Sequence, residues 1–181
     1  MGIISSDKDD FEKLLNYFKI HPKCEKEIIE LFKSRGNDVK LLTVFTTRLG
    51  QLKELGVSAV KLGRKSFEIL KQTNGIYSMH IDTAEVNYRV LYSFTRENSI
   101  LLHGFFEKAG KKATDYKTAI PIAQHRRKEW EDQGAASRNV WQQQDSRLPE
   151  KAEEEEPGSL RRIRIFICHF FCVRRSHRSK H

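Results

Sequence analysis

The residue types that could do chemistry in this chain gather around two consecutive apolar stretches. The first, residues 87–94, carries Arg89 within an otherwise apolar run, and the second covers residues 99–107. A basic cluster follows the second stretch: Lys108, Lys111 and Lys112. Guanidinium and ammonium groups fixed on a rigid sheet can hold and polarise a phosphodiester. The pattern therefore predicts a site for the backbone of a nucleic acid.

The elements that must position these residues follow from the period of the apolar positions. Helical spacing predicts three N-terminal helices, over residues 7–20, 22–33 and 39–55. After Gly63 the spacing becomes strand-like and predicts strands over 66–71, 76–82, 86–94 and 99–107. Asn74-Gly75 favours a tight hairpin turn, and the loop 95–98 has a length that closes an antiparallel hairpin. A closing helix is expected over 114–131.

This order of elements predicts an α+β domain over residues 1–134, with N-terminal helices packed on a small antiparallel sheet and a closing C-terminal helix. Residues 135–159 are rich in Gln and Glu and read as a disordered acidic linker. Residues 160–181 form a basic and apolar tail of unknown role. The apolar run within the tail, 163–173, is about half the length needed to span a bilayer. The tail could lie in an anionic membrane interface, bind nucleic acid, or have no function.

Charge and cysteine content narrow the class of protein. The net charge is +9, but seven Lys and Arg and no acid lie in residues 160–181, so the rest of the chain carries only about +2 (9 − 7). The position of each cation in the domain therefore matters more than the total. Cys24 is the only cysteine of the domain, which favours a reducing, cytoplasmic compartment. The acidic N-terminus does not read as a secretory signal, and no membrane partner is expected.

Several motifs, in this order, resemble the RelE/HigB superfamily, the toxins of type II toxin–antitoxin systems, and in particular its phage-derived HigB-like branch. They are the run YRVLY at 88–92, LLHGF at 101–105, Lys108, Lys111-Lys112, YKTAIPIA at 116–123, and Arg126-Arg127. The resemblance is good over about residues 60–130 and only architectural over 1–59. It implies a RelE-like fold, which agrees with the pattern of elements above.

The resemblance also implies an activity and its partners. Toxins of this superfamily are mRNA interferases, endoribonucleases that block translation by cleaving mRNA in the ribosomal A site. Their accepted chemistry uses no metal or other cofactor, because the ribose 2′-hydroxyl attacks the adjacent phosphate and expels the 5′-oxygen. The implied partners are mRNA, the ribosome and a cognate antitoxin, with a helix-turn-helix domain expected in the antitoxin.

Site residues follow from the same resemblance. Arg89 stands where the family has its phosphate-stabilising arginine. If its alternating neighbours face the core, Arg89 faces outward on the exposed side of the sheet; the alternative is a surface arginine in a cross-strand ion pair. Lys108 matches a second basic catalytic residue. Lys111 and Lys112 are expected to hold flanking RNA phosphates, or to form a solvated basic loop.

Three further residues complete the candidate set. Tyr116 matches a tyrosine that stacks on or orients the substrate, and it also fits a half-buried helix tyrosine. His80 and Ser78 replace residues that many relatives share. An imidazole can act as general acid or base near neutral pH, so His80 is either the proton carrier or a sign of lost function. His103 fits the family motif, as a structural hydrogen-bonding residue or as the proton carrier.

Two rival functions remain. A non-catalytic module that binds RNA or the ribosome would keep the fold without the chemistry, as the change at His80 suggests. A gyrase inhibitor of the related ParE branch would bind a protein instead. The combination of Arg89 with Lys108 argues against that branch, which lacks the catalytic basic set.

Overall fold

The computed structural model describes residues 5–36, 38–62, 65–96, 98–108 and 112–144. The described helices are α1 (Ser5–Tyr17), α2 (Pro22–Arg35), α3 (Val39–Leu55), α4 (Ser58–Lys61) and α5 (Lys112–Gln144). The described strands are β1 (Lys19–Ile20), β2 (Phe67–Ile69), β3 (Tyr77–Asp82), β4 (Asn87–Phe94) and β5 (Ser99–Phe106). The predicted α+β class is confirmed, with helices first, a mostly antiparallel sheet, and a C-terminal helix.

Local capping explains where the N-terminal helices begin and end. Pro22 is the first residue of α2, where an N–H group has no partner within the helix, so the N–H that proline lacks costs nothing. The side chain of His21, just before α2, accepts a hydrogen bond from Lys23 N. Asp38 caps α3, because its Oδ1 accepts from Leu41 N at 3.0 Å. Gly56 ends α3 with a φ of 49°, in the left-handed region of backbone conformation that glycine adopts more easily than residues with a Cβ.

The described strands form one sheet in the order β1-β5-β4-β3-β2. All neighbours pair antiparallel except β1, which runs parallel to β5 and pairs only with Ile100 and Leu101. The four predicted strands and the four-residue loop between β4 and β5 are confirmed. Two short elements, β1 and α4, were not predicted. Because β1 pairs only with Ile100 and Leu101, the part of β5 beyond Leu101 is an edge of the sheet, and its backbone can form hydrogen bonds with side chains.

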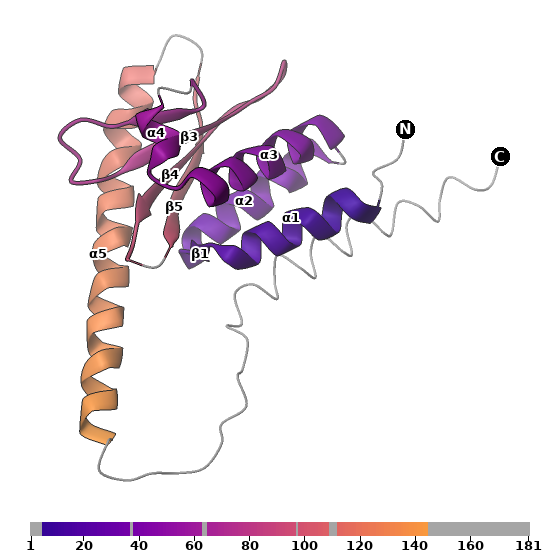
Figure 1. The fold of residues 1–181 in the computed structure, drawn as a ribbon. Helices are drawn as coiled ribbons and strands as arrows, with labels where there is room; N and C mark the ends of the chain where they lie inside the picture. Colours follow the sequence, from indigo (N-terminus) through magenta and orange to yellow (C-terminus); the bar gives the residue numbers. More distant parts are fainter. Residues whose placement is uncertain (1–4, 37, 63–64, 97, 109–111, 145–181) are drawn as a thin grey trace.

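Both faces of the sheet are covered (Figure 1). Helices α1, α2 and α3 pack on one face, where the rings of Phe11, Phe32 and Phe45 meet each other in the centre of the larger core. Helix α5 covers the other face through Tyr116, Ala119 and Ala123 and encloses a smaller core there. Polar residues on the second face are thus placed between the sheet and α5.

Helix α5 is longer than expected. The sequence predicts a helix over 114–131, whereas α5 begins at Lys112 and continues to Gln144, with Pro121 inside it. The first ten residues of the expected linker, 135–144, are therefore helical. The rest of that linker and the basic tail, 145–181, lie outside the described residues. Among the described helices, none is both long and apolar enough to cross a membrane.

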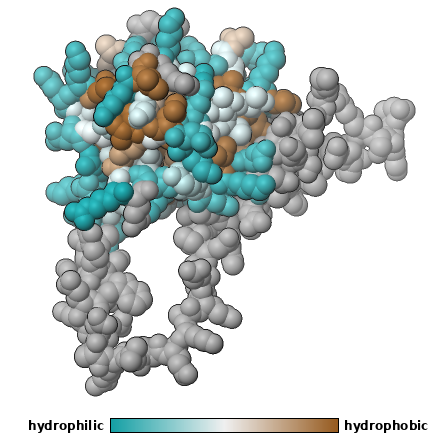
Figure 2. All heavy atoms as spheres, in the orientation of Figure 1, coloured by the Kyte–Doolittle hydropathy of each residue, from teal (hydrophilic) through white to brown (hydrophobic). Residues whose placement is uncertain are grey.

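A surface patch of apolar side chains lies over α4, with hydrophilic residues around it (Figure 2). Val57 and Leu62, which flank α4, are 43% and 62% exposed. Scattered exposed apolar residues are common on soluble domains, but a gathered patch is typical of a surface that contacts another molecule.

Two glycines test the packing of this fold. A Cβ at Gly104 would lie 2.8 Å from Cζ of the buried Tyr88 and closer still to its hydroxyl. A Cβ at Gly50, inside α3, would meet only Leu14 Cδ1, at 4.0 Å. We expect Gly104→Ala to lower the free energy of unfolding by about 1–3 kcal/mol. Gly50→Ala should raise it by about 0.5–1 kcal/mol, because alanine favours a helix. Urea denaturation measures both, and a Gly104→Ala protein as stable as wild type would contradict the close packing.

Candidate functional site

Arg89 lies on β4 and points to the face of the sheet that carries α5. Its neighbours Tyr88 and Val90 point into the larger core, so the predicted alternation is correct. The predicted exposure is wrong, since Arg89 is only 6% exposed. Helix α5 covers this face, and two carboxylates enclose the guanidinium.

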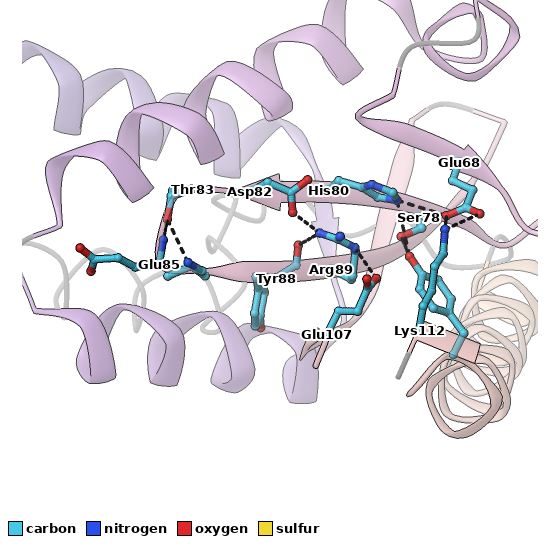
Figure 3. A network of polar contacts seen from close by, with 12 residues as sticks. Glu68, Ser78, His80, Asp82, Thr83, Glu85, Tyr88, Arg89, Glu107 and Lys112 are labelled. Atoms are coloured by element: carbon cyan, nitrogen blue, oxygen red, sulfur yellow. Dashed lines mark hydrogen bonds and ion pairs between the residues drawn. The ribbon is translucent and has the colours of Figure 1, made fainter. Parts of the chain in front are cut away.

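Those carboxylates come from both neighbouring strands (Figure 3). Glu107 Oε2, just after β5, accepts from Arg89 Nε at 2.9 Å, and Asp82 Oδ1, at the end of β3, accepts from Arg89 Nη1. The carbonyl of Tyr88 also accepts from Nη1, at 3.1 Å. Burial lowers the pKa of Arg89, but the hydrogen bond and charge of Asp82 and the charge of Glu107 raise it overall. The site thus holds a fixed, permanently charged guanidinium.

His80 is the cross-strand partner of Arg89 and belongs to a second set of polar contacts (Figure 3). Its Nε2 lies 3.2 Å from Oε2 of Glu68, which faces it from β2. The ammonium of Lys112, in the first turn of α5, lies 3.1 Å from Oε1 and 3.0 Å from Oε2 of the same carboxylate. Glu68 therefore links the start of α5 to the imidazole on the sheet.

The charge state of His80 suits a proton acceptor. Burial, and then the charge of Arg89, lower its pKa below the ordinary 6.5; Asp82 and Glu68 offset this only in part. The imidazole is therefore neutral at pH 7. Because a carboxylate only accepts hydrogen bonds, a neutral His80 bonded to Glu68 carries its proton on Nε2. Its Nδ1 is then the basic nitrogen.

Tyr116 reaches the same cluster from α5. Its hydroxyl lies 2.7 Å from Ser78 Oγ and 3.5 Å from His80 Nε2. Burial raises its pKa to about 12, although the hydrogen bond with Ser78 acts in the opposite direction. The phenol is thus protonated and only 6% exposed, which suits positioning of His80 better than open stacking on a base.

Of the expected lysines, the structure brings one into this cluster. Lys112 contacts Glu68, as described above. Lys108 follows β5 as an exposed residue whose backbone N–H donates to Asp115 Oδ2 at 2.8 Å. Among the described residues its ammonium forms no ion pair. Lys111 lies outside the described residues.

His103 belongs to a different cluster, at the open edge of β5. Its Nδ1 lies 3.0 Å from Oε2 of Glu27, an α2 residue that also accepts from Gly104 N at 2.8 Å. Arg126 of α5 donates to both oxygens of Glu27, at 2.9 and 2.7 Å, and to the carbonyl of Leu102. Burial raises the pKa of Glu27, but the hydrogen bonds from His103, Arg126 and Gly104 lower it overall. This arrangement ties α2, β5 and α5 together, so His103 has a structural position.

Sequence reasoning missed two acidic members of the site, Glu68 and Asp82, and noted Glu107 only as an acid that reduces the local positive charge. The hairpin register could have indicated Glu68, because it pairs with Ser78 on the face that also carries His80. Asp82 stands two residues after His80 and so faces the same side. Within the described part of the chain, no group of three or more His, Cys, Asp or Glu side chains could hold a metal ion.

The Glu27–Arg126 pair generates a stability prediction. Glu27→Gln leaves the nearly buried guanidinium of Arg126 without its counter-charge, so we expect the free energy of unfolding to fall by about 3 kcal/mol. Glu131→Gln is the matched control, because Glu131 pairs with Arg127 on the exposed side of α5. For Glu131→Gln the free energy of unfolding should fall by less than about 0.5 kcal/mol in the same urea titration. Equal losses for the two variants would contradict the structural role.

The lowered pKa of His80 predicts a pH dependence of stability. The unfolded chain, with an ordinary histidine pKa of 6.5, binds protons more readily than the fold does. The contribution of His80 is thus present above pH 6.5 and is lost as the pH falls through the folded pKa. Unfolding free energies at about pH 7.5 and about pH 5 should therefore differ less in His80→Asn than in wild type. An unchanged pH difference would show that His80 does not titrate in this way.

Comparison with known proteins adds a family. The model of the family "Phage derived protein Gp49-like (DUF891)" matches residues 36–128, more than half of the chain. The matched segment runs from the start of α3 into α5 and includes Glu68, His80, Arg89 and Lys112. Comparison with curated proteins finds no match, and comparison with solved structures finds none either. The chain belongs to the Gp49-like family of phage-derived proteins, a RelE/HigB-like toxin family.

Proposed function

We propose that this protein is the toxin of a type II toxin–antitoxin system and that it is an mRNA interferase. One observation supports the proposal most directly. Arg89, with a permanently charged guanidinium, and His80, with a neutral imidazole, are directly paired residues of the neighbouring strands β4 and β3. Membership of the Gp49-like family supports the toxin role. Cleavage of RNA by its own 2′-hydroxyl needs these two groups, a base for the hydroxyl proton and a cation for the phosphate.

The reaction runs in one displacement. Nδ1 of His80 takes the proton of the ribose 2′-hydroxyl, and the 2′-oxygen forms a bond to the adjacent phosphorus. The bond from phosphorus to the 5′-oxygen breaks, and the imidazolium returns its proton to that oxygen. The products are a 2′,3′-cyclic phosphate and a 5′-hydroxyl. Glu68 positions His80 and stabilises its charged form, while Tyr116 holds the ring from α5.

Cations stabilise the charge that develops on the phosphate. Arg89 uses Nε and Nη1 for its described contacts, and Nη2 takes part in none of them, so Nη2 is the group offered to a phosphate oxygen. Lys108, the exposed residue that follows Glu107, adds a further ammonium. Lys112 and Lys111 hold the flanking phosphates.

The partners follow from the same proposal. The substrate is mRNA, bound by the ribosome when it is cleaved. Family membership implies an antitoxin partner. We propose that this antitoxin has a helix-turn-helix domain and that it covers the basic residues around the site.

A second candidate is a non-catalytic module that binds RNA or the ribosome. The observation in its favour is that two carboxylates already hold Arg89, so a phosphate must compete with Asp82 and Glu107. Such a module would bind RNA with a strong salt dependence and leave it intact.

The first experiment compares two histidine variants of the full chain, expressed from a tightly controlled promoter. His80→Asn removes the proposed base, and His125→Asn changes a histidine of α5 whose side chain is 74% exposed. We expect wild type and His125→Asn to arrest growth and to produce new mRNA 5′ ends within translated regions. His80→Asn should reduce cleavage at least about 100-fold, the usual contribution of a general base.

Each other outcome identifies a different function. Growth arrest with intact mRNA and a DNA-damage response would favour a gyrase inhibitor. Intact mRNA with ribosome-bound protein would favour the binding module. Full cleavage by His80→Asn would show that another residue moves the proton.

A further inference from the structure

A groove of about 470 Å³ lies between β2, the loop that follows it, and the first turns of α5. This volume is within the range of small-molecule sites in proteins. Its apolar wall consists of Ile69, Leu70 and Ile120, together with the buried ring of Tyr116. Ile69 is 55% exposed, so the wall is open to an incoming ligand.

The polar side chains that line the groove are few. Lys112 and Lys71 contribute ammonium groups, and Glu68 contributes a carboxylate. Glu68 is the residue that contacts His80 at 3.2 Å, so the groove borders the candidate site. A ligand bound here would therefore lie beside the reacting groups.

We propose that this groove binds a nucleobase of the RNA, that of a nucleotide next to the cleaved bond. The inference rests on the function proposed above and adds a subsite to it. A nucleobase has flat apolar faces, which can pack on the wall formed by Ile69, Leu70 and Ile120, and polar edges that can donate to Glu68. Its nucleotide carries phosphates, which attract Lys71 and Lys112.

The charges favour a nucleotide over a peptide. Two of the three charged residues that line the groove are cationic, and the ammonium of Lys71 forms no ion pair in the described part of the chain. A peptide strand could instead pair with β2, the outer strand of the sheet, but β2 offers only Phe67–Ile69 for such a ladder. Binding of a protein segment is thus the competing outcome.

The test fills the groove without changing a charge. Ala113 is an exposed residue of the groove, and Ala113→Leu adds apolar volume there. Ala84→Leu is the matched control, because Ala84 is exposed in the turn between β3 and β4. Both full-length proteins are titrated with a short RNA that carries a 2′-deoxy sugar at the cleavage position, alone and in the A site of ribosomes. A set of RNAs that each lack one base is titrated in parallel.

For wild type we expect one missing base to weaken binding about tenfold, the usual effect of losing one stacked base. Ala113→Leu should weaken binding of the complete RNA to the same extent, and removal of that base should then cost nothing more. Ala84→Leu should behave as wild type. Ile69→Ala, which removes part of the wall, should act in the same direction as Ala113→Leu.

Other results overturn the inference. If Ala113→Leu and removal of the base each weaken RNA binding independently, so that their effects on the binding free energy add, the base binds elsewhere. If Ala113→Leu does not change RNA binding, or if wild type binds neither the free nor the ribosome-bound RNA, the groove does not bind a nucleobase. Binding of a protein segment would then be favoured. Failure of the proposed function gives a different result. If the effects of Ala113→Leu and of the missing base on RNA binding are coupled, but all-ribose RNA is not cleaved, the base-binding subsite is supported and only the proposed cleavage reaction is excluded.

Discussion

The buried charge of Arg89 is the constraint on which the candidate site depends. A guanidinium enclosed between a sheet and a helix is stable only with counter-charges and filled hydrogen bonds. Asp82 and Glu107, from the strands on either side, supply both. They fix the cation in place and keep it charged. Burial lowers the pKa of His80, and the same cation lowers it further. The ion-pair cluster thus sets the position of the cation and, together with burial, contributes to the neutral state of His80.

A second cluster, around Arg126, secures the elements that the first one needs. Because β1 pairs with only two residues of β5, the backbone of Gly104 is open, and Glu27 satisfies its N–H from α2. Arg126 then joins that carboxylate to α5. Helix α5 is thereby held against the sheet, and this places Lys112 and Tyr116 beside Glu68 and His80. His103, which sequence reasoning considered as a proton carrier, belongs to this structural cluster.

The sequence predicts the elements well because local signals define them. Pro22, Asp38 and Gly56 mark helix ends, and the period of apolar residues separates helices from strands. Alternation also places Arg89 and His80 on the face opposite Tyr88. What local patterns do not contain is which element covers that face. The burial of Arg89 depends on the packing of α5, and Glu27 reaches His103 across 76 positions of sequence, so neither could be deduced from spacing.

The two carboxylates around Arg89 also limit what the site can do. A phosphate must approach a guanidinium whose charge is already balanced, so the free energy of binding comes from Nη2 and from exposed cations such as Lys108. For the proposed interferase we therefore expect a modest ground-state affinity for RNA. A pentavalent phosphorane carries more negative charge than the bound phosphodiester, and it competes better with Asp82 and Glu107. In the proposed reaction, an arginine held in this way would favour the transition state over the substrate, which is the condition for catalysis rather than for simple binding.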